Sequence, residues 1–249
     1  MDLNLESILV HADKNWKEGI RSSNQAEREF KLGIAANLLQ RLISVDSKHS
    51  LALNNLGGVF DALGKYIEAV DVLKKAIEIS PNYIHAYNGL GHAYNLLGRF
   101  DEAVDVLKRA IEIDPKRVKA IDPDSDVLYS TSYNNLGYAY NLLGRFDEAV
   151  DVLKKAIRLN SEDTSAYGHI GDSHRLLGKK KVAEEYYNKS LSLFEQKRDK
   201  TIFDYLRAIR AERGLIKIGA INQGEIEQDV LLKGIVTPSL LTRLYTFEK

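Results

Sequence analysis

Residues Ala93 to Lys108 read AYNLLGRFDEAVDVLK, and the same letters recur without a change from Ala139 to Lys154. A related stretch lies upstream, from Asn54 to Pro81, and a more divergent one lies downstream, from Tyr167 to Leu193. Such self-similarity is typical of stacked units, because one unit cannot bury its apolar face alone. The sequence therefore predicts a solenoid rather than a single compact core.

One unit, from Ser50 to Tyr83, shows how each repeat is built. Its apolar residues have helical spacing on both sides of Gly64, which stands where a helix should end. Gly57 and Ala69 lack bulk where two antiparallel helices have to approach closely. Pro81 cannot continue the second helix. The unit is therefore predicted to be a helix, a glycine turn and a second helix.

This pattern resembles the tetratricopeptide repeat, whose period is 34 residues. In the first copy the resemblance is carried by Leu53, Leu56, Gly57, Phe60, Gly64, Tyr66, Ala69, Leu73, Ala76 and Pro81. The second and third copies keep this pattern, with Ser161 in place of the last proline, while the fourth departs from it at His174, Lys180 and Ser190. The resemblance implies an all-α solenoid of helical hairpins with a right-handed superhelical course and no β-sheet.

Four repeats are expected, at residues 50–83, 84–117, 130–163 and 164–193. The identical stretches start 46 residues apart, so residues 118–129 form an insertion. Asp122 and Pro123 resemble an N-cap and first helical residue, which predicts that the first helix of the third repeat begins near Pro123, about two turns early. The insertion is either an ordinary loop expansion, which costs little on a surface, or a lip over the groove. We favour the loop expansion.

Residues outside the repeats read as atypical helices at both ends of the solenoid. Residues 1–49 form a degenerate N-terminal helical pair, with a break at Ser22 to Asn24. Residues 194–249 contain capping helices, at about Thr201 to Arg213, ended by Gly214, at Glu225 to Lys233 and at Pro238 to Phe247. The last of these either caps the stack or lies in the groove. Atypical ends are expected, because terminal repeats need a face that stops the stacking.

Composition limits the classes of function that remain. Lys plus Arg and Asp plus Glu both total 35, which argues against a protein dedicated to nucleic acid or to a membrane surface. Cysteine is absent, so disulfides, thiolate metal sites and cysteine nucleophiles are excluded. The N-terminus lacks the apolar segment of a secretory signal, and no apolar run is long enough to cross a bilayer. A cytoplasmic location is expected.

The resemblance implies that the first helix of each repeat lines a concave groove. The residues placed there are Asn54, Asn55, His85, Asn88, His92, Asn95, Asn134, Asn135, Tyr138, Asn141, His169, Asp172 and Arg175. Asparagine is a poor helix former, yet it recurs here within helices. Its amide both donates and accepts, so a ladder of asparagines suits an extended peptide backbone. Duplication of the repeats explains part of the recurrence equally well, and both interpretations stand.

Other chemistry receives little support from the sequence. The clamp with which some family members bind an acidic C-terminus needs Lys and Arg, where this chain has Asn54, Asn88 and Asn135. His85 and His92 are two turns apart, about 10 Å, which is too far to share one metal ion. His169 and Asp172, one turn apart, are placed to share a proton, although a solvated or structural pair is more common. No nucleophile, base and acid set is visible, so no enzyme, metal or cofactor is expected.

The sequence therefore favours a scaffold or adaptor that binds a peptide or helix of a protein partner in its groove. A second hypothesis is a self-assembling subunit of a homo-oligomer or larger complex. A third, weaker hypothesis is nucleic-acid binding through residues 179–217, where basic side chains outnumber acidic ones. The identity of the partner is not encoded in any motif of the chain.

Overall fold

The computed structural model describes residues 4–22, 24–198 and 202–220. The predicted C-terminal helices at Glu225 to Lys233 and Pro238 to Phe247 lie outside these residues. The described part of the chain is helical throughout and contains no strand. Its helices are α1 (Leu5–Arg21), α2 (Gln25–Val45), α3 (Ser50–Ala62), α4 (Tyr66–Ile79), α5 (Ile84–Leu96), α6 (Phe100–Glu112), α7 (Pro115–Ile121), α8 (Ser125–Leu142), α9 (Phe146–Leu159), α10 (Thr164–Leu176), α11 (Lys180–Gln196) and α12 (Ile202–Ile218).

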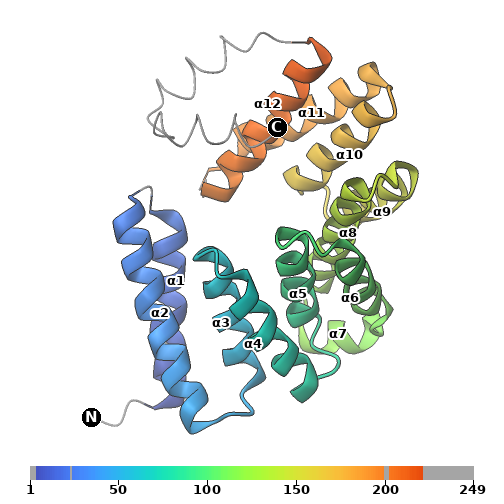
Figure 1. Cartoon of the computed structure of the whole chain (residues 1–249). Coiled ribbons are helices and arrows are strands. Elements are labelled where there is room, and N and C mark those ends of the chain that lie inside the picture. Colours follow the sequence, from blue (N-terminus) through green and yellow to red (C-terminus); the bar gives the residue numbers. More distant parts are fainter. Residues whose placement is uncertain (1–3, 23, 199–201, 221–249) are drawn as a thin grey trace.

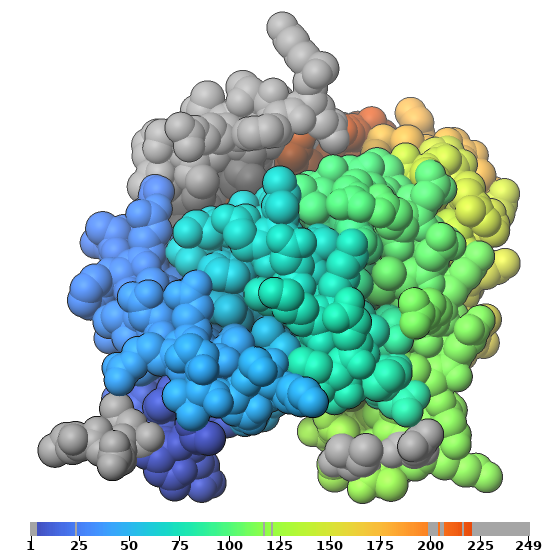
Figure 2. All heavy atoms as spheres, turned by 60° about the horizontal axis from the view of Figure 1, so that its bottom comes forward, coloured from blue at the N-terminus to red at the C-terminus, as the bar shows by residue number. Residues whose placement is uncertain are grey.

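Helices pair into antiparallel hairpins that follow one another in chain order along an open arc (Figure 1). The pairs are α1 with α2, α3 with α4, α5 with α6, α8 with α9, and α10 with α11. Figure 2 shows the same progression on one face, from the N-terminal hairpin through the central repeats. The predicted all-α solenoid is confirmed.

Glycine sets the turn inside each repeat. Gly64, Gly98, Gly144 and Gly178 follow the first helices and have φ between 73° and 74°, a left-handed conformation that costs glycine little. The next amide then closes the helix end, as where Lys65 N donates to Phe60 O at 2.8 Å and Arg99 N donates to Tyr94 O at 2.9 Å. These turns lie where the repeat pattern predicted them.

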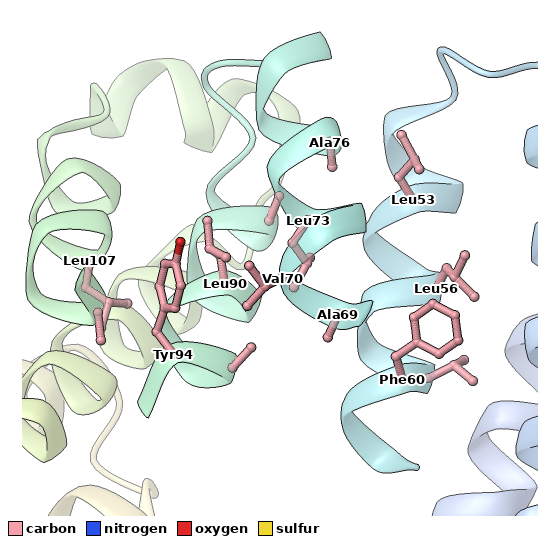
Figure 3. Close-up of a cluster of buried hydrophobic side chains, with 14 of the residues drawn as sticks. Leu53, Leu56, Phe60, Ala69, Val70, Leu73, Ala76, Leu90, Tyr94 and Leu107 are labelled. Carbon is pink, nitrogen blue, oxygen red and sulfur yellow. The ribbon is translucent and has the colours of Figure 1, made fainter. Parts of the chain in front are cut away.

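A second set of glycines brings the two helices of a hairpin together. A Cβ at Gly57 would lie 2.6 Å from Leu73 Cγ, and one at Gly91 would lie 2.5 Å from Leu107 Cγ. Gly137 meets Leu153 in the same way. In Figure 3, Ala69, Leu73 and Ala76 of α4 lie between Leu53 and Leu56 of the preceding helix and Leu90 and Tyr94 of the next one. Small residues on one helix thus admit large ones from the other, and one core runs from Ile8 to Ile170.

The insertion is helical and packed rather than a surface loop. It contributes the end of α7 and the start of α8, which begins at Ser125, two residues after the predicted start. Val118 and Tyr129 are buried with Ile84 and Ile113. Tyr129 also donates a hydrogen bond to the carbonyl oxygen of Ile113 at 2.6 Å. The favoured loop expansion is therefore corrected, because the inserted apolar side chains cover the end of the second repeat.

Gly214 does not end a helix, as the sequence suggested, but lies inside α12, which continues to Ile218 and ends at Gly219 with φ 79°. The reason is Tyr187, which replaces the leucine of the other repeats and is fully buried. Its ring lies against Gly171 on one side and Gly214 on the other. Gly214 is thus a point of close helix contact, through which α12 docks on α11.

Candidate functional site: the face of the first helices

The first helices of neighbouring repeats touch one another along the inside of the arc. Contacts join α3 to α5, α5 to α8, α8 to α10 and α10 to α12. Within the described residues, the second helices of neighbouring repeats form no comparable contacts. Helices on the inner side of a curved stack are necessarily closer together. The first helices therefore form the concave face, and α12 packs against α10 and α11 beyond the fourth repeat.

The residues predicted to line the groove divide into two groups by exposure. Asn88, Asn95, Asn134 and His169 are buried, with at most 8% of their surface exposed. The others are half-buried: Asn54, Asn55, His85, His92, Asn135, Tyr138, Asn141, Asp172 and Arg175. A partner that approaches this face meets the second group first.

Asparagines at the repeat interfaces bond to the protein itself. Asn95 Nδ2 donates to the carbonyl oxygen of Asn135 at 3.0 Å, and Asn141 Nδ2 donates to that of His169, also at 3.0 Å. Because Asn95 and Asn141 hold the same place in their repeats, one hydrogen bond recurs at two successive interfaces. These asparagine side chains thus join α5 to α8 and α8 to α10.

Asn88 makes a similar bridge through both ends of its amide. Nδ2 donates to the carbonyl oxygen of Leu128 at 2.9 Å, and Oδ1 accepts from Ser132 Oγ at 2.5 Å. Asn54 is its counterpart one repeat earlier and donates to the side chain of Asn55 at 3.3 Å. The same residue type therefore bridges repeats at one position and remains half-exposed at the other.

His85 and His92 are each paired with a different carboxylate. His85 Nε2 lies 3.2 Å from Asp122 Oδ2, which belongs to the insertion. His92 Nδ1 lies 3.1 Å from Asp61 Oδ1 on the preceding first helix. Among the described residues, no three His, Cys, Asp or Glu side chains are arranged to hold a metal ion. These histidines cross-link neighbouring segments on the concave face.

His169 is the most enclosed titratable group on this face. Arg210 Nη1 contacts its Nε2, and since a guanidinium only donates, Nε2 is the acceptor. Nδ1 therefore carries the proton and donates to Asn134 Oδ1 at 2.9 Å. Burial, reinforced by the positive charges of Arg210 and Arg207, holds the pKa of His169 well below its ordinary value. The ring is neutral at physiological pH.

The pairing of His169 with Asp172, considered from sequence, is not formed. Asp172 accepts a hydrogen bond from the Tyr187 hydroxyl at 2.8 Å and lies 3.8 Å from Arg175 Nη2. Burial, and after it the proximity of the Asp172 carboxylate, raises the pKa of Tyr187 above its usual range. Asp172 therefore helps to position the second helix of its own repeat.

Arg210 is a residue of this face that the sequence did not single out. Besides His169, its guanidinium lies over the Tyr138 ring, 5.0 Å from the centroid, and Tyr138 stacks on His169 with centroids 4.8 Å apart. Arg210 thereby ties α12 to α8 and α10. Its only signal in the sequence was its place in a basic stretch outside the repeats.

The basic stretch at residues 179–217 is partly neutralised within the fold. Asp204 is 2% exposed, and its Oδ1 lies 2.7 Å from Lys197 Nζ and 3.3 Å from Arg207 Nη1. A buried carboxylate needs such cationic neighbours. Lys197, at the end of α11, therefore helps to dock α12, while Arg207 stabilises the same carboxylate from within α12.

The described helices include none that is long and apolar enough to cross a membrane.

Comparison with known families identifies the repeats. The tetratricopeptide repeat profile matches residues 51–116 and 128–196, more than half of the chain. The break between the two matched segments coincides with α7 and the start of α8. No functionally curated protein matches the sequence.

Several solved structures share the fold. PilW, described as a widely conserved type IV pilus biogenesis factor, has a TM-score of 0.63 at 18% identity, over 94% of this chain and 98% of its own. A thermophilic tetratricopeptide repeat protein of Thermus thermophilus gives 0.59 at 21% identity, over 82% and 99%. MamA of Desulfovibrio magneticus gives 0.53 at 21% identity, over 76% and 98%. At these identities the similarity concerns the fold alone.

Proposed function

Because this chain belongs to the tetratricopeptide repeat family, we propose that it is a scaffold or adaptor that binds a peptide or helix of a protein partner on its concave face. The observation that carries the proposal is the row of half-buried polar side chains on successive first helices. They include Asn54, Asn55, His92, Asp172 and Arg175. These half-buried polar groups are partly exposed to solvent, so they can form hydrogen bonds to a partner. An apolar surface would not offer such bonds.

The hydrogen bonds of this face separate asparagines that connect neighbouring helices from asparagines that are accessible to a partner. The amides of Asn88, Asn95 and Asn141 are engaged with neighbouring helices and fix the curvature. Asn54 and Asn55 make contact with each other and remain accessible at the N-terminal part of the arc. We therefore propose that a partner backbone is held first at α3. No catalytic function is proposed.

The proposal is tested by blocking the accessible part of the face without removing a bridge between repeats. Peptides are selected from a random phage-displayed library against the full chain, and their binding is measured by calorimetry. Asn54→Arg combined with Asn55→Arg should weaken binding by at least about tenfold, since two long side chains fill the surface. Asp71→Arg, an exposed change on α4, serves as the control and should leave affinity unchanged.

A second outcome would contradict the proposal. If the selected peptides bind the α3 double variant as tightly as the wild type and lose affinity to the Asp71 variant, binding occurs on the outer helices. The concave-face proposal would then be wrong. Thermal unfolding of each variant, measured in parallel, ensures that any loss of binding comes from the surface and not from unfolding.

A further inference from the structure

Three leucines at equivalent positions are exposed along one edge of the solenoid. Leu96, Leu142 and Leu176 are the last residues of α5, α8 and α10, and 40%, 44% and 45% of their surfaces are exposed. The leucines that follow two of them, Leu97 and Leu143, pack against the core instead. An exposed apolar side chain repeated at the same place in three repeats is a candidate contact surface.

The position of this leucine row follows from the stacking of the hairpins. Each leucine stands two residues before the glycine of the intra-repeat turn, at Gly98, Gly144 and Gly178. Because the hairpins stack in chain order (Figure 1), their turns recur along one edge of the arc. The leucine row therefore lies on the turn edge and is distinct from the polar residues of α3.

Charge is distributed unevenly along the same edge. The first turn of α6 carries exposed Asp101 and Glu102 behind Arg99, and α9 repeats this arrangement. Arg99 pairs with Glu102, so Asp101 supplies the net negative charge there. At the equivalent place in the fourth repeat, the chain has Lys179, Lys180 and Lys181, all exposed. The edge is thus acidic at the second and third repeats and basic at the fourth.

We propose that this turn edge binds a second copy of the chain in antiparallel orientation. Reversing the direction places Leu142 beside its own counterpart near a two-fold axis and brings Leu96 opposite Leu176 of the second copy. The same reversal sets Asp101 against Lys181 of the second copy, and each such pair occurs twice in a two-fold contact. A parallel arrangement would instead bring like charges together at all three repeats, whereas the antiparallel one does so only at the third repeat, near the axis. The sequence of charges therefore selects the antiparallel dimer.

The whole chain also permits association, because its formal net charge is zero and two copies do not repel each other overall. The contact involves one exposed leucine in each of three repeats, which places it among small, concentration-dependent interfaces rather than obligate ones. Since the turn edge and the face of the first helices are separate, one dimer can present two concave faces. The dimer goes beyond the proposed peptide binding and does not depend on it.

The dimer is tested by sedimentation velocity of the full chain over a concentration series at low and high salt. The wild type should shift from monomer to dimer as concentration rises, and the midpoint should move to higher concentration in high salt. Leu142→Glu should raise the midpoint at least about tenfold, because it places two carboxylates at the two-fold axis. Val45→Glu, at an exposed valine outside the row, is the matched control and should not move it.

Charge reversal then tests the antiparallel register. Asp101→Lys alone and Lys181→Asp alone should each weaken the dimer, whereas the double variant should recover it, because the reversed pairs again attract. A wild type that stays monomeric throughout the series, or a Leu142→Glu variant that associates unchanged, would overturn the proposal. Failure of the double variant to recover would overturn the antiparallel register. Groove binding measured on Leu142→Glu should be unaffected, which separates this inference from the proposed function.

Discussion

At the scale of single residues, asparagine changes its role between repeats. Inside a helix asparagine has a lower helix propensity than alanine, which by itself lowers the stability of the protein. Asn88 offsets this cost because its amide bridges to Leu128 and Ser132 of the next repeat. Asn54 occupies the same position one repeat earlier and contacts Asn55. Residue type and repeat position alone therefore do not define what the side chain does.

This difference is directly measurable by unfolding in urea. Asn88→Ala should lower the free energy of unfolding by about 1–2 kcal/mol, since two hydrogen bonds are lost in a buried place. Asn54→Ala should leave stability unchanged or raise it by about 0.5 kcal/mol, because alanine is the better helix former. Equal effects of the two substitutions would show that the bridge to Leu128 contributes nothing.

His169 should make stability depend on pH. Burial is the main cause that lowers the pKa of His169 in the folded protein below its ordinary value of 6.5. As the pH falls below that value, the unfolded chain therefore binds a proton at His169 that the folded protein does not bind. The stability it contributes is present above the unfolded pKa and is lost as pH falls below about 6.5. The loss is about 1.4 kcal/mol for each pH unit until the folded pKa is reached.

The measurement compares the wild type with His169→Gln, which does not titrate. Urea unfolding at about pH 7.5 and about pH 5.5 should show the wild type losing about 1 kcal/mol more than the variant. Taking the difference between the two proteins removes the effects of other groups, including Asp163, whose pKa burial raises. Parallel pH dependence in both proteins would mean that His169 is accessible to protons in the folded state.

At the scale of elements, close approach of paired helices depends on glycine at one position. Gly91→Ala should cost about 1–3 kcal/mol, because the new Cβ would meet Leu107 in a packed core. Gly33 in α2 provides the control, since a Cβ there meets nothing within 4 Å. Gly33→Ala should stabilise the protein by about 0.5–1 kcal/mol through lower backbone entropy in the unfolded state. Thermal unfolding distinguishes the two, and an unchanged melting temperature for Gly91→Ala would contradict the helix pairing.

At the scale of the whole molecule, stability is local, because each hairpin contacts mainly its neighbours. The C-terminal end depends on α12, which docks through Gly214 against Tyr187 and through Arg210 against His169. Loss of this docking should loosen the end of the solenoid without disturbing its centre.

Gly214→Leu tests this view of the molecule. The substitution forces Tyr187 and α12 apart, so hydrogen exchange in α12 should become about tenfold to a hundredfold faster. Exchange in α3 and α5 should not change, since those helices belong to the first and second repeats, away from α12. A uniform increase across the chain would show that the solenoid opens as one cooperative unit, and no increase in α12 would show that it is not held by this contact.

The sequence by itself determined the repeats, the turn glycines and the glycines opposite large side chains, because all of these depend on neighbours within one 34-residue unit. Only the tertiary structure decided the bond from Asn95 to Asn135, the contact of Arg210 with His169, the role of Gly214 and the packing of the insertion. These partners lie in different units, and their distance depends on how far each hairpin rotates against the next. Periodicity records the fold of a unit, whereas the angle between units is set by packing across all their interfaces.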